Sequence, residues 1–219
     1  MKKILSDHDR DWLNLRIVET EKCTNTQIVL AVIKRSDSYA EIPWRAFALG
    51  ASVAGLLFFI LNLLLNYWIS QAMVLIAVAA TLFGGATFAL LAVFVPGFAK
   101  LFLSAHRAEV EVRQYAESLF LERELFATSK RMGMLLLISL FEQQVILLPD
   151  KGVRNRLTMD ALRKVITPMT LLLKRNEISK ALEDGLKQLS FILEAKTDGG
   201  LANGNENNLP NEIIEEKGV

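Results

Sequence analysis

The chain has 219 residues, a formal net charge of +1 and a hydrophobic share of 52%. Acidic and basic residues alternate along it, which excludes the clustered positive charge of a nucleic-acid-binding surface. Its single cysteine, Cys23, excludes an internal disulfide and agrees with a reducing compartment.

The first 33 residues predict a helix followed by a strand. Ser6 is a suitable N-cap, and apolar residues recur at helical spacing until the polar run 23–26 ends the helix. Residues 27–33 are almost all apolar and many are branched, which is typical of a central strand buried on both faces. Cys23 is expected to be a small buried residue, and His8 to be solvated.

Two long apolar segments follow, at 46–65 and 72–95. Each contains only two plainly polar residues and no charge. Each is long enough, at about 1.5 Å per residue, to cross a hydrocarbon core of about 30 Å. Residues 66–71 between them are too few to fold separately. The sequence therefore predicts a transmembrane hairpin.

The charges around the hairpin predict its orientation. The connecting loop carries none, whereas basic residues flank both outer ends: Lys34, Arg35, Arg45, Lys100 and Arg107. The positive-inside rule then places both termini and the remaining domain in the cytoplasm, as in a multi-pass protein of a bacterial inner membrane. Trp44, Tyr67 and Trp68 are expected at the headgroup layers. No apolar core follows the basic start of the chain, so we expect no cleaved targeting segment.

The second half predicts a helix, two strands and two further helices. Apolar residues at helical spacing over 108–120 predict a surface helix packed on a sheet. The apolar runs 133–141 and 145–148 predict an antiparallel pair of strands. Thr158 is expected to cap a helix that Pro168 bends or splits, and a last amphipathic helix follows.

These elements predict an α/β fold, a small mixed sheet covered by helices and interrupted by the two-helix transmembrane hairpin. Residues 6–43 and 99–195 are the two parts of one domain, and residues 44–98 are the hairpin. Residues 196–219, rich in Gly and Asn, have too little apolar content to fold and are predicted to be a disordered tail. Small residues four apart in both spans would let the helices pack closely, within the hairpin or in a homodimer.

Several segments resemble the TPM domain family, in the same order along the chain. Residues 21–29 resemble its first helix-to-strand junction, and residues 133–139 are similar to its GVLLxVS strand. Residues 141–153 resemble the hairpin and D-x-G-[IV] loop that follow. The Ala-His-Arg stretch at 105–107 is similar to the one that follows a two-helix insertion in a bacterial, membrane-anchored branch. The resemblance covers residues 10 to about 195.

The resemblance implies an α/β/α domain with a role in maintaining membrane complexes. It also implies the acid phosphatase activity of plant members and the calcium binding of some others. This sequence departs from their pattern, because Lys130-Arg131-Met132 precedes the second strand where relatives place acidic or amide residues, and the glycine-rich loop is reduced to residues 151–153. Both departures argue against an inherited phosphatase activity.

We therefore expect a membrane-anchored interaction or maintenance module without catalysis of its own. Its expected partners are membrane lipids and other membrane proteins, and no cofactor is expected; Ca²⁺ is implied by the resemblance alone. A metal-dependent phosphomonoesterase is the alternative.

The most site-like residues are charged or turn-forming and lie beside the predicted strand ends: Lys130, Arg131, Asp150, Lys151, Gly152 and Arg154. They are candidates for binding an anion, since α/β folds keep ligands at strand ends. The alternative is a solvated turn in which the aspartate and glycine serve backbone geometry. If strands 27–33 and 133–141 are parallel, loops 130–132 and 150–154 share one end of the sheet and residues 34–37 lie at the other. An antiparallel pairing would bring all three together.

Two further candidates lie beside the second span. His106 and Arg107 could bind a lipid phosphate or a phosphoryl group, although the favoured interpretation of Arg107 is an interface anchor that follows the positive-inside rule. A metal would need Asp37, Asp150 and Asp160 to converge, and no tight acidic motif indicates that they do. The sequence has no P-loop, GxGxxG, GxSxG or HExxH motif.

Overall fold

The computed structural model describes residues 4–65, 70–194 and 213–218. They fall into two compact units, one of Met1–Asp37 with Ala108–Val219 and one of Ser38–Arg107. The first unit is an α/β domain built from chain segments on both sides of the second, which is helical.

A four-stranded sheet forms the centre of the α/β unit. Its strands are β1 (Gln27–Ile33), β2 (Gly133–Ser139), β3 (Gln144–Pro149) and β4 (Ile214–Glu216), in the order β3-β2-β1-β4. β1 runs parallel to β2 and β4, whereas β2 and β3 form an antiparallel hairpin. Every residue of β1 and β2 is buried, as the continuous apolar runs predicted for a sheet covered on both faces.

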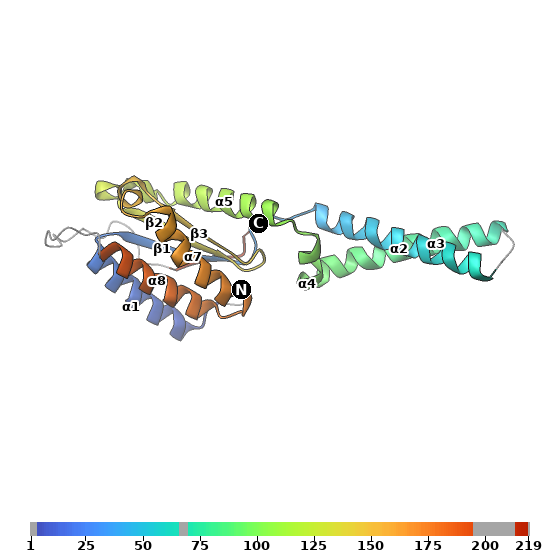
Figure 1. Ribbon diagram of the computed structural model, residues 1–219, viewed down its shortest axis with the longest axis horizontal. Coiled ribbons are helices and arrows are strands. Elements are labelled where there is room, and N and C mark those ends of the chain that lie inside the picture. Colours follow the sequence, from blue (N-terminus) through green and yellow to red (C-terminus); the bar gives the residue numbers. More distant parts are fainter. Residues whose placement is uncertain (1–3, 66–69, 195–212, 219) are drawn as a thin grey trace. The chain divides into compact units, whose positions relative to one another are not determined.

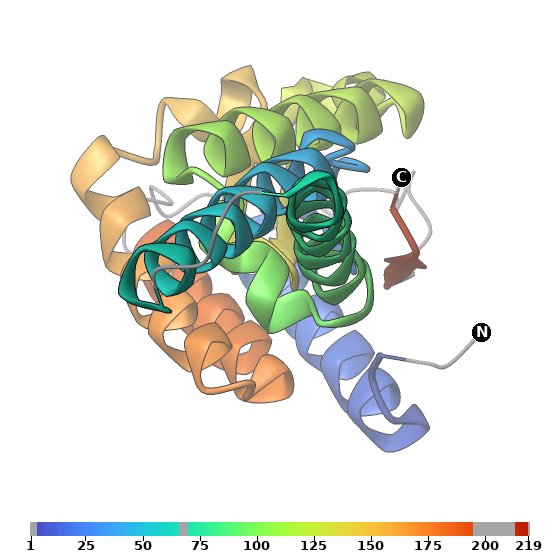
Figure 2. The ribbon, with the colours of Figure 1, turned by 90° about the vertical axis from the view of Figure 1, so that its right-hand side faces the viewer.

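Helices cover the two faces of this sheet (Figures 1 and 2). α1 (Asp7–Thr24), α7 (Met159–Lys174) and α8 (Ile178–Glu194) lie on one face, and α5 (Ala105–Glu122) lies on the other. Alternate residues of β1 therefore enter different cores: Leu30 packs under α1, α7 and α8, and Ala31 packs under α5. This arrangement confirms the predicted mixed sheet covered by helices.

Local signals explain where most of these elements begin and end. The side chain of Ser6 caps α1, and Asn25 ends it in the left-handed conformation at φ 54°. Thr158 caps α7, as predicted, but Pro168 lies inside a continuous helix and does not split it. Asp150 caps α6 (Lys151–Arg154), a short helix where the sequence predicted a turn.

The second unit contains α2 (Glu41–Leu65), α3 (Gln71–Phe94) and α4 (Pro96–Ala99), followed by the 3₁₀ turn η1 (Lys100–Phe102). α2 and α3 are long and apolar enough to cross a membrane. Most of their large apolar side chains are exposed, and only two residues of α3, Gly85 and Ala92, are buried. The predicted headgroup anchors Tyr67 and Trp68 lie outside the described residues.

Small residues let α2 and α3 approach closely. A Cβ added to Gly50 would lie 2.6 Å from the carbonyl oxygen of Gly84, and one added to Gly84 would lie 2.5 Å from the Cβ of Ala54. Any larger side chain at these two positions would force the helices apart, which agrees with the predicted small-residue packing.

The end of the chain corrects one prediction. Residues 196–219 were predicted to be a disordered tail, yet Ile214–Glu216 form β4 on the edge of β1. The low apolar content of the tail predicted that it would not fold. Its two consecutive isoleucines, Ile213 and Ile214, nevertheless pack against the sheet, and this long-range contact does not follow from composition. The part of the predicted tail from 196 to 212 lies outside the described residues.

Candidate functional site

The parallel pairing of β1 with β2 separates the predicted loops. β1 and β2 begin, and antiparallel β3 ends, at one end of the sheet, which therefore carries residues 130–132 and 150–154. Residues 34–37 follow β1 and belong to the opposite end. Of the two arrangements considered, the one that brings all three loops together does not occur.

The two loops at the first end are in direct contact. A Cβ on Gly152 would lie 2.6 Å from the carbonyl oxygen of Lys130 and 2.7 Å from that of Arg131, so only glycine fits this crossing. Lys130 and Arg131 lie in the 3₁₀ turn η3 (Ser129–Arg131), and both have positive φ, 64° and 57°. Non-glycine residues reach that region at an energetic cost, so the surrounding packing imposes this conformation.

An arginine–aspartate pair joins the loops. Arg131 donates from Nε to Asp150 at 2.8 Å and from Nη2 at 3.1 Å, in the two-pronged geometry that guanidinium and carboxylate favour. The amide of Lys151 donates to the same carboxylate at 2.7 Å, and Asp150 is only 6% exposed. The hydrogen bond to Asp150 raises the pKa of Arg131 above its ordinary value. Both oxygens of Asp150 are therefore engaged within the protein.

The pairing changes what the candidate anion site can do. Arg131 and Asp150 neutralise each other, and the exposed Lys130, Lys151 and Arg154 remain as surface cations of this loop pair. A hollow of about 300 Å³ beside Asp150 has no basic lining. It is lined by apolar residues and two carboxylates: Phe120, Leu121, Leu148, Pro149, Glu117 and Asp150. The surface cations therefore do not line the hollow beside Asp150.

The opposite end of the sheet contains a buried carboxylate that the sequence did not single out. Glu142 accepts from the amide of Ser36 at 3.0 Å and from its hydroxyl at 2.7 Å, and its second oxygen accepts from Ser139. Arg35 stacks over the ring of Phe141 at 4.8 Å. The adjacent Gln143 has a positive φ of 54°, the mark of the tight turn predicted between the strands. Glu142 therefore ties residue 36 to the β2–β3 turn.

Glu21 is a second carboxylate outside the predicted site, and it is partly buried. Its Oε1 accepts from the amide of Ile28 at 2.8 Å, and its buried Oε2 has no hydrogen-bond partner among the described residues. Burial raises the pKa of Glu21 to about 7, an effect that the bond from Ile28 partly opposes. No motif marks this residue, because its environment comes from tertiary packing.

The lipid-interface candidates belong to the helical unit. His106 and Arg107 are both exposed, and Nε of Arg107 lies 3.7 Å from Oε1 of Glu41. Within the described parts of the chain, no group of three or more histidine, cysteine, aspartate or glutamate residues could hold a metal ion. Asp37, Asp150 and Asp160 do not form such a group.

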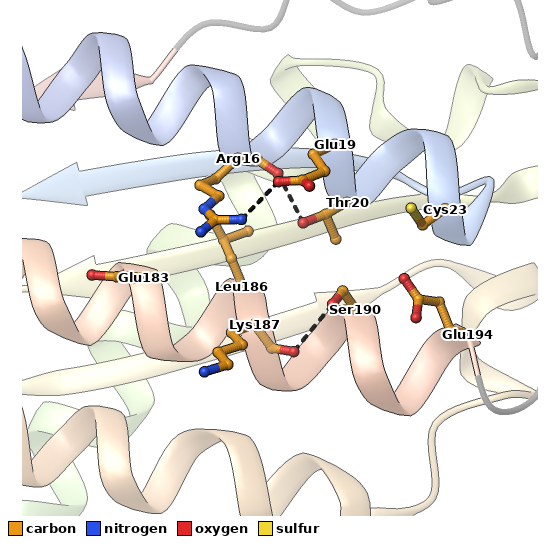
Figure 3. Close-up of a pocket in the computed structure, with 9 residues that line it drawn as sticks. All are labelled: Arg16, Glu19, Thr20, Cys23, Glu183, Leu186, Lys187, Ser190 and Glu194. Atoms are coloured by element: carbon orange, nitrogen blue, oxygen red, sulfur yellow. Dashed lines mark hydrogen bonds and ion pairs between the residues drawn. The ribbon is translucent and has the colours of Figure 1, made fainter.

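A further hollow of about 200 Å³ lies between α1 and α8 (Figure 3). Cys23 borders it and is exposed, which corrects the prediction of a buried residue. Partial desolvation, followed by the neighbouring Glu194, raises the pKa of the Cys23 thiol. A raised pKa disfavours the thiolate, which is the nucleophilic form of cysteine. Arg16, at the same hollow, is paired with Glu19 at 2.7 Å.

The comparisons with known proteins agree with this architecture. The family model described as TPM domain matches residues 93–190. The NMR structure of the BA42 protein from the psychrophilic bacterium Bizionia argentinensis is similar, with a TM-score of 0.58. The similarity covers 98% of this chain and 97% of BA42 at 13% sequence identity, which supports a shared fold. No curated protein matches the chain.

Proposed function

Because residues 93–190 match the family model of the TPM domain, we propose that this chain is a membrane-anchored interaction or maintenance module for other membrane proteins, without catalysis of its own. α2 and α3 are the proposed anchor, since their exposed apolar surfaces suit lipid. The α/β domain and both termini are proposed to lie on the cytoplasmic side of a bacterial inner membrane. Lipids would contact the basic flanks of the helices, and the hairpin helices could also pair with those of a second copy.

The main support for a role without catalysis is that Asp150 already accepts hydrogen bonds from within the protein. It is the carboxylate of the candidate loop pair, and Arg131 and the Lys151 amide occupy both of its oxygens. A hydrolytic site needs a cation or acid–base groups around the phosphate. Lys130, Lys151 and Arg154 could attract an anion, such as a lipid headgroup, without supplying a group to cleave it. A calcium ion would likewise have to displace Arg131 before it could use Asp150.

The alternative is a metal-dependent phosphomonoesterase, and a hydrolysis assay discriminates between the two. The purified full chain is given a chromogenic phosphate monoester with calcium, with magnesium or with a chelator. We expect no metal-dependent turnover. Turnover that disappears in Asp150→Asn and persists in the control Asp160→Asn, an exposed aspartate in the first turn of α7, would overturn the proposal.

The topology has its own test, which uses the single native cysteine. Cys23 is exposed in the α/β unit, and Ser70 caps α3 at the far end of the hairpin. A membrane-impermeant maleimide should leave Cys23 unlabelled in intact cells and label it after lysis. In a Cys23→Ser, Ser70→Cys chain, the reagent should label intact cells. The reverse pattern would refute a cytoplasmic domain.

A further inference from the structure

β4 completes the sheet at the edge of β1. Ile214, Glu215 and Glu216 pair in parallel with Ala31, Val32 and Ile33, and the amide of Lys34 donates to the carbonyl oxygen of Glu216 at 3.3 Å. Figure 2 shows this short strand in dark red. β1 is apolar and buried along its whole length, so its free edge would be a template for any extended chain.

The segment is recognised on both faces of the sheet. Ile213 is 1% exposed and lies in the core under α1, α7 and α8, and Ile214 packs against the core under α5. The next two residues, Glu215 and Glu216, also point to opposite faces of the sheet. Each face thus receives one apolar side chain and, two residues later, one acidic side chain, as the period of a strand requires.

On the α1 face, the partners of Glu215 come from the start of the chain. Its Oε2 accepts from the amide of Ile4 at 2.9 Å, and Oε1 lies 3.3 Å from Nε of Arg10. Arg10 also donates from Nη2 to the carbonyl oxygen of Ile213 at 3.2 Å. Arg10 therefore contacts both the backbone of the segment, at Ile213, and its acidic side chain, at Glu215.

On the α5 face, Glu216 has a separate pair of partners. The hydroxyl of Tyr115 donates to its Oε2 at 2.6 Å, and Nη2 of Arg123 lies 3.3 Å from its Oε1. Beyond it, Gly218 has a φ of 75°, and a Cβ there would overlap the carbonyl oxygen of Arg35. The groove therefore selects two apolar residues, two acidic residues and a glycine two positions later.

We propose that this groove, formed by the β1 edge with Arg10 on one side and Tyr115 and Arg123 on the other, is a peptide-binding site. Its ligand is an extended segment of a partner protein with two apolar residues followed by two acidic residues. Residues 213–218 occupy the groove in cis and compete with that ligand. The inference rests on the proposed function, because it names the surface through which an interaction module would bind.

β4, the strand bound in cis, covers only part of the free edge of β1. It pairs with three residues of β1, and among the described residues no strand pairs with 27–30 on that side. The Glu216–Arg123 pair is partly exposed, and solvent weakens such pairs. A ligand that also pairs with 27–30 gains backbone hydrogen bonds that the cis strand lacks, once it replaces the carboxylate of Glu21 as the acceptor for the amide of Ile28.

The same reasoning favours a partner protein over a second copy of this chain. The same segment from another copy would make contacts identical to those of the cis segment, which has the advantage of tethering. Displacement therefore requires a ligand with additional contacts, which a different protein can supply.

The test measures binding of a fluorescein-labelled peptide with the sequence of residues 211–219 to the purified full chain in detergent. In Glu215→Lys/Glu216→Lys, the reversed charges should vacate the groove, and the peptide should bind at least tenfold more tightly than to the unaltered chain. Adding Arg10→Glu and Arg123→Glu should remove that binding. A control peptide with lysine in place of Glu215 and Glu216 should not bind.

A second variant that should empty the groove controls for misfolding of the charge-reversed chain. Gly218→Val cannot keep the φ of 75° or the approach to Arg35, yet it leaves both carboxylates unchanged. Equal or absent peptide binding in both vacated variants, with thermal unfolding still cooperative, would overturn the proposal. A fall from dimer to monomer in light scattering on vacating the groove would also overturn it, because the occupant would then be the strand of a second copy. Neither result bears on phosphate hydrolysis, so a failure here is distinguishable from a failure of the proposed function.

Discussion

β1 and α3 have similar side chains and opposite environments. Both are apolar and uncharged, yet all seven residues of β1 are buried, whereas most of the large apolar side chains of α3 are exposed. Apolar composition alone therefore does not distinguish a core strand from a candidate membrane helix. Length does, because seven residues cannot cross a bilayer and the 24 of α3 can.

Removal of the helical unit should have the strongest effect on where the protein is found. If the exposed apolar surface of α2 and α3 is the anchor, replacing residues 44–98 by a short Gly/Ser linker should move the protein from the membrane fraction to the soluble fraction. The α/β domain should still unfold cooperatively, since its two core clusters contain no residue of α2 or α3. A chain consisting of residues 99–195 is the control, because it lacks β1. Equal stability of that fragment would contradict a single domain built from both segments.

Two leucine substitutions measure how differently the sheet and the apolar helices contribute to stability. Leu136 in β2 is fully buried, and Leu61 in α2 is 55% exposed. Leu136→Ala should lower the free energy of unfolding of the α/β domain by about 2–5 kcal/mol, through lost burial and the remaining cavity. Leu61→Ala should change it by less than about 0.5 kcal/mol. Denaturant titration in detergent, followed by the circular dichroism of the domain, measures both. Similar losses would show that α2 supports the domain core.

Glycines test whether the helical unit has packing of its own. Gly50→Leu should destabilise the α2–α3 pair by about 1–3 kcal/mol, since the added side chain meets the Gly84 carbonyl and Phe88. Gly97→Leu is the matched control, because a Cβ there meets nothing within 4 Å. The readout is the thermal loss of helical signal in the isolated hairpin in micelles. Equal effects would mean that the two helices do not pack closely in the membrane.

Local patterns predicted the elements of the α/β domain but not the way its loops combine. The apolar run of β1, the cap at Ser6 and the β2–β3 hairpin were all readable, because each depends on neighbouring residues. The Arg131–Asp150 pair was not, since it depends on the parallel pairing of β1 and β2 and on the crossing at Gly152. The six candidate residues do gather at one end, but Arg131 and Asp150 bind each other.

β4 was missed for a related reason. Its residues pair with a strand more than 180 positions earlier in the chain, and three residues give no periodicity to recognise. The burial of Glu142 has no local signal, because nothing in the neighbouring sequence shows that Ser36 lies beside it. Long-range partners, rather than composition, decide which polar residues of this domain are buried.

The last prediction concerns Glu21, whose buried Oε2 has no hydrogen-bond partner among the described residues. Burial raises the pKa of Glu21 to about 7 from 4.5. A raised carboxyl pKa means that the unfolded chain releases this proton first, so the group's contribution to stability is complete below pH 4.5 and is lost as the pH rises through about 7. After allowance for partial solvent screening, the free energy of unfolding should fall by about 1–2 kcal/mol.

Glu21→Gln keeps an acceptor for the Ile28 amide and should remove this decline in stability, whereas Glu19→Gln, an exposed neighbour on α1, should not. Thermal midpoints between pH 4 and 8 measure it, and an unchanged slope in Glu21→Gln would show that Glu21 is solvated in the folded protein.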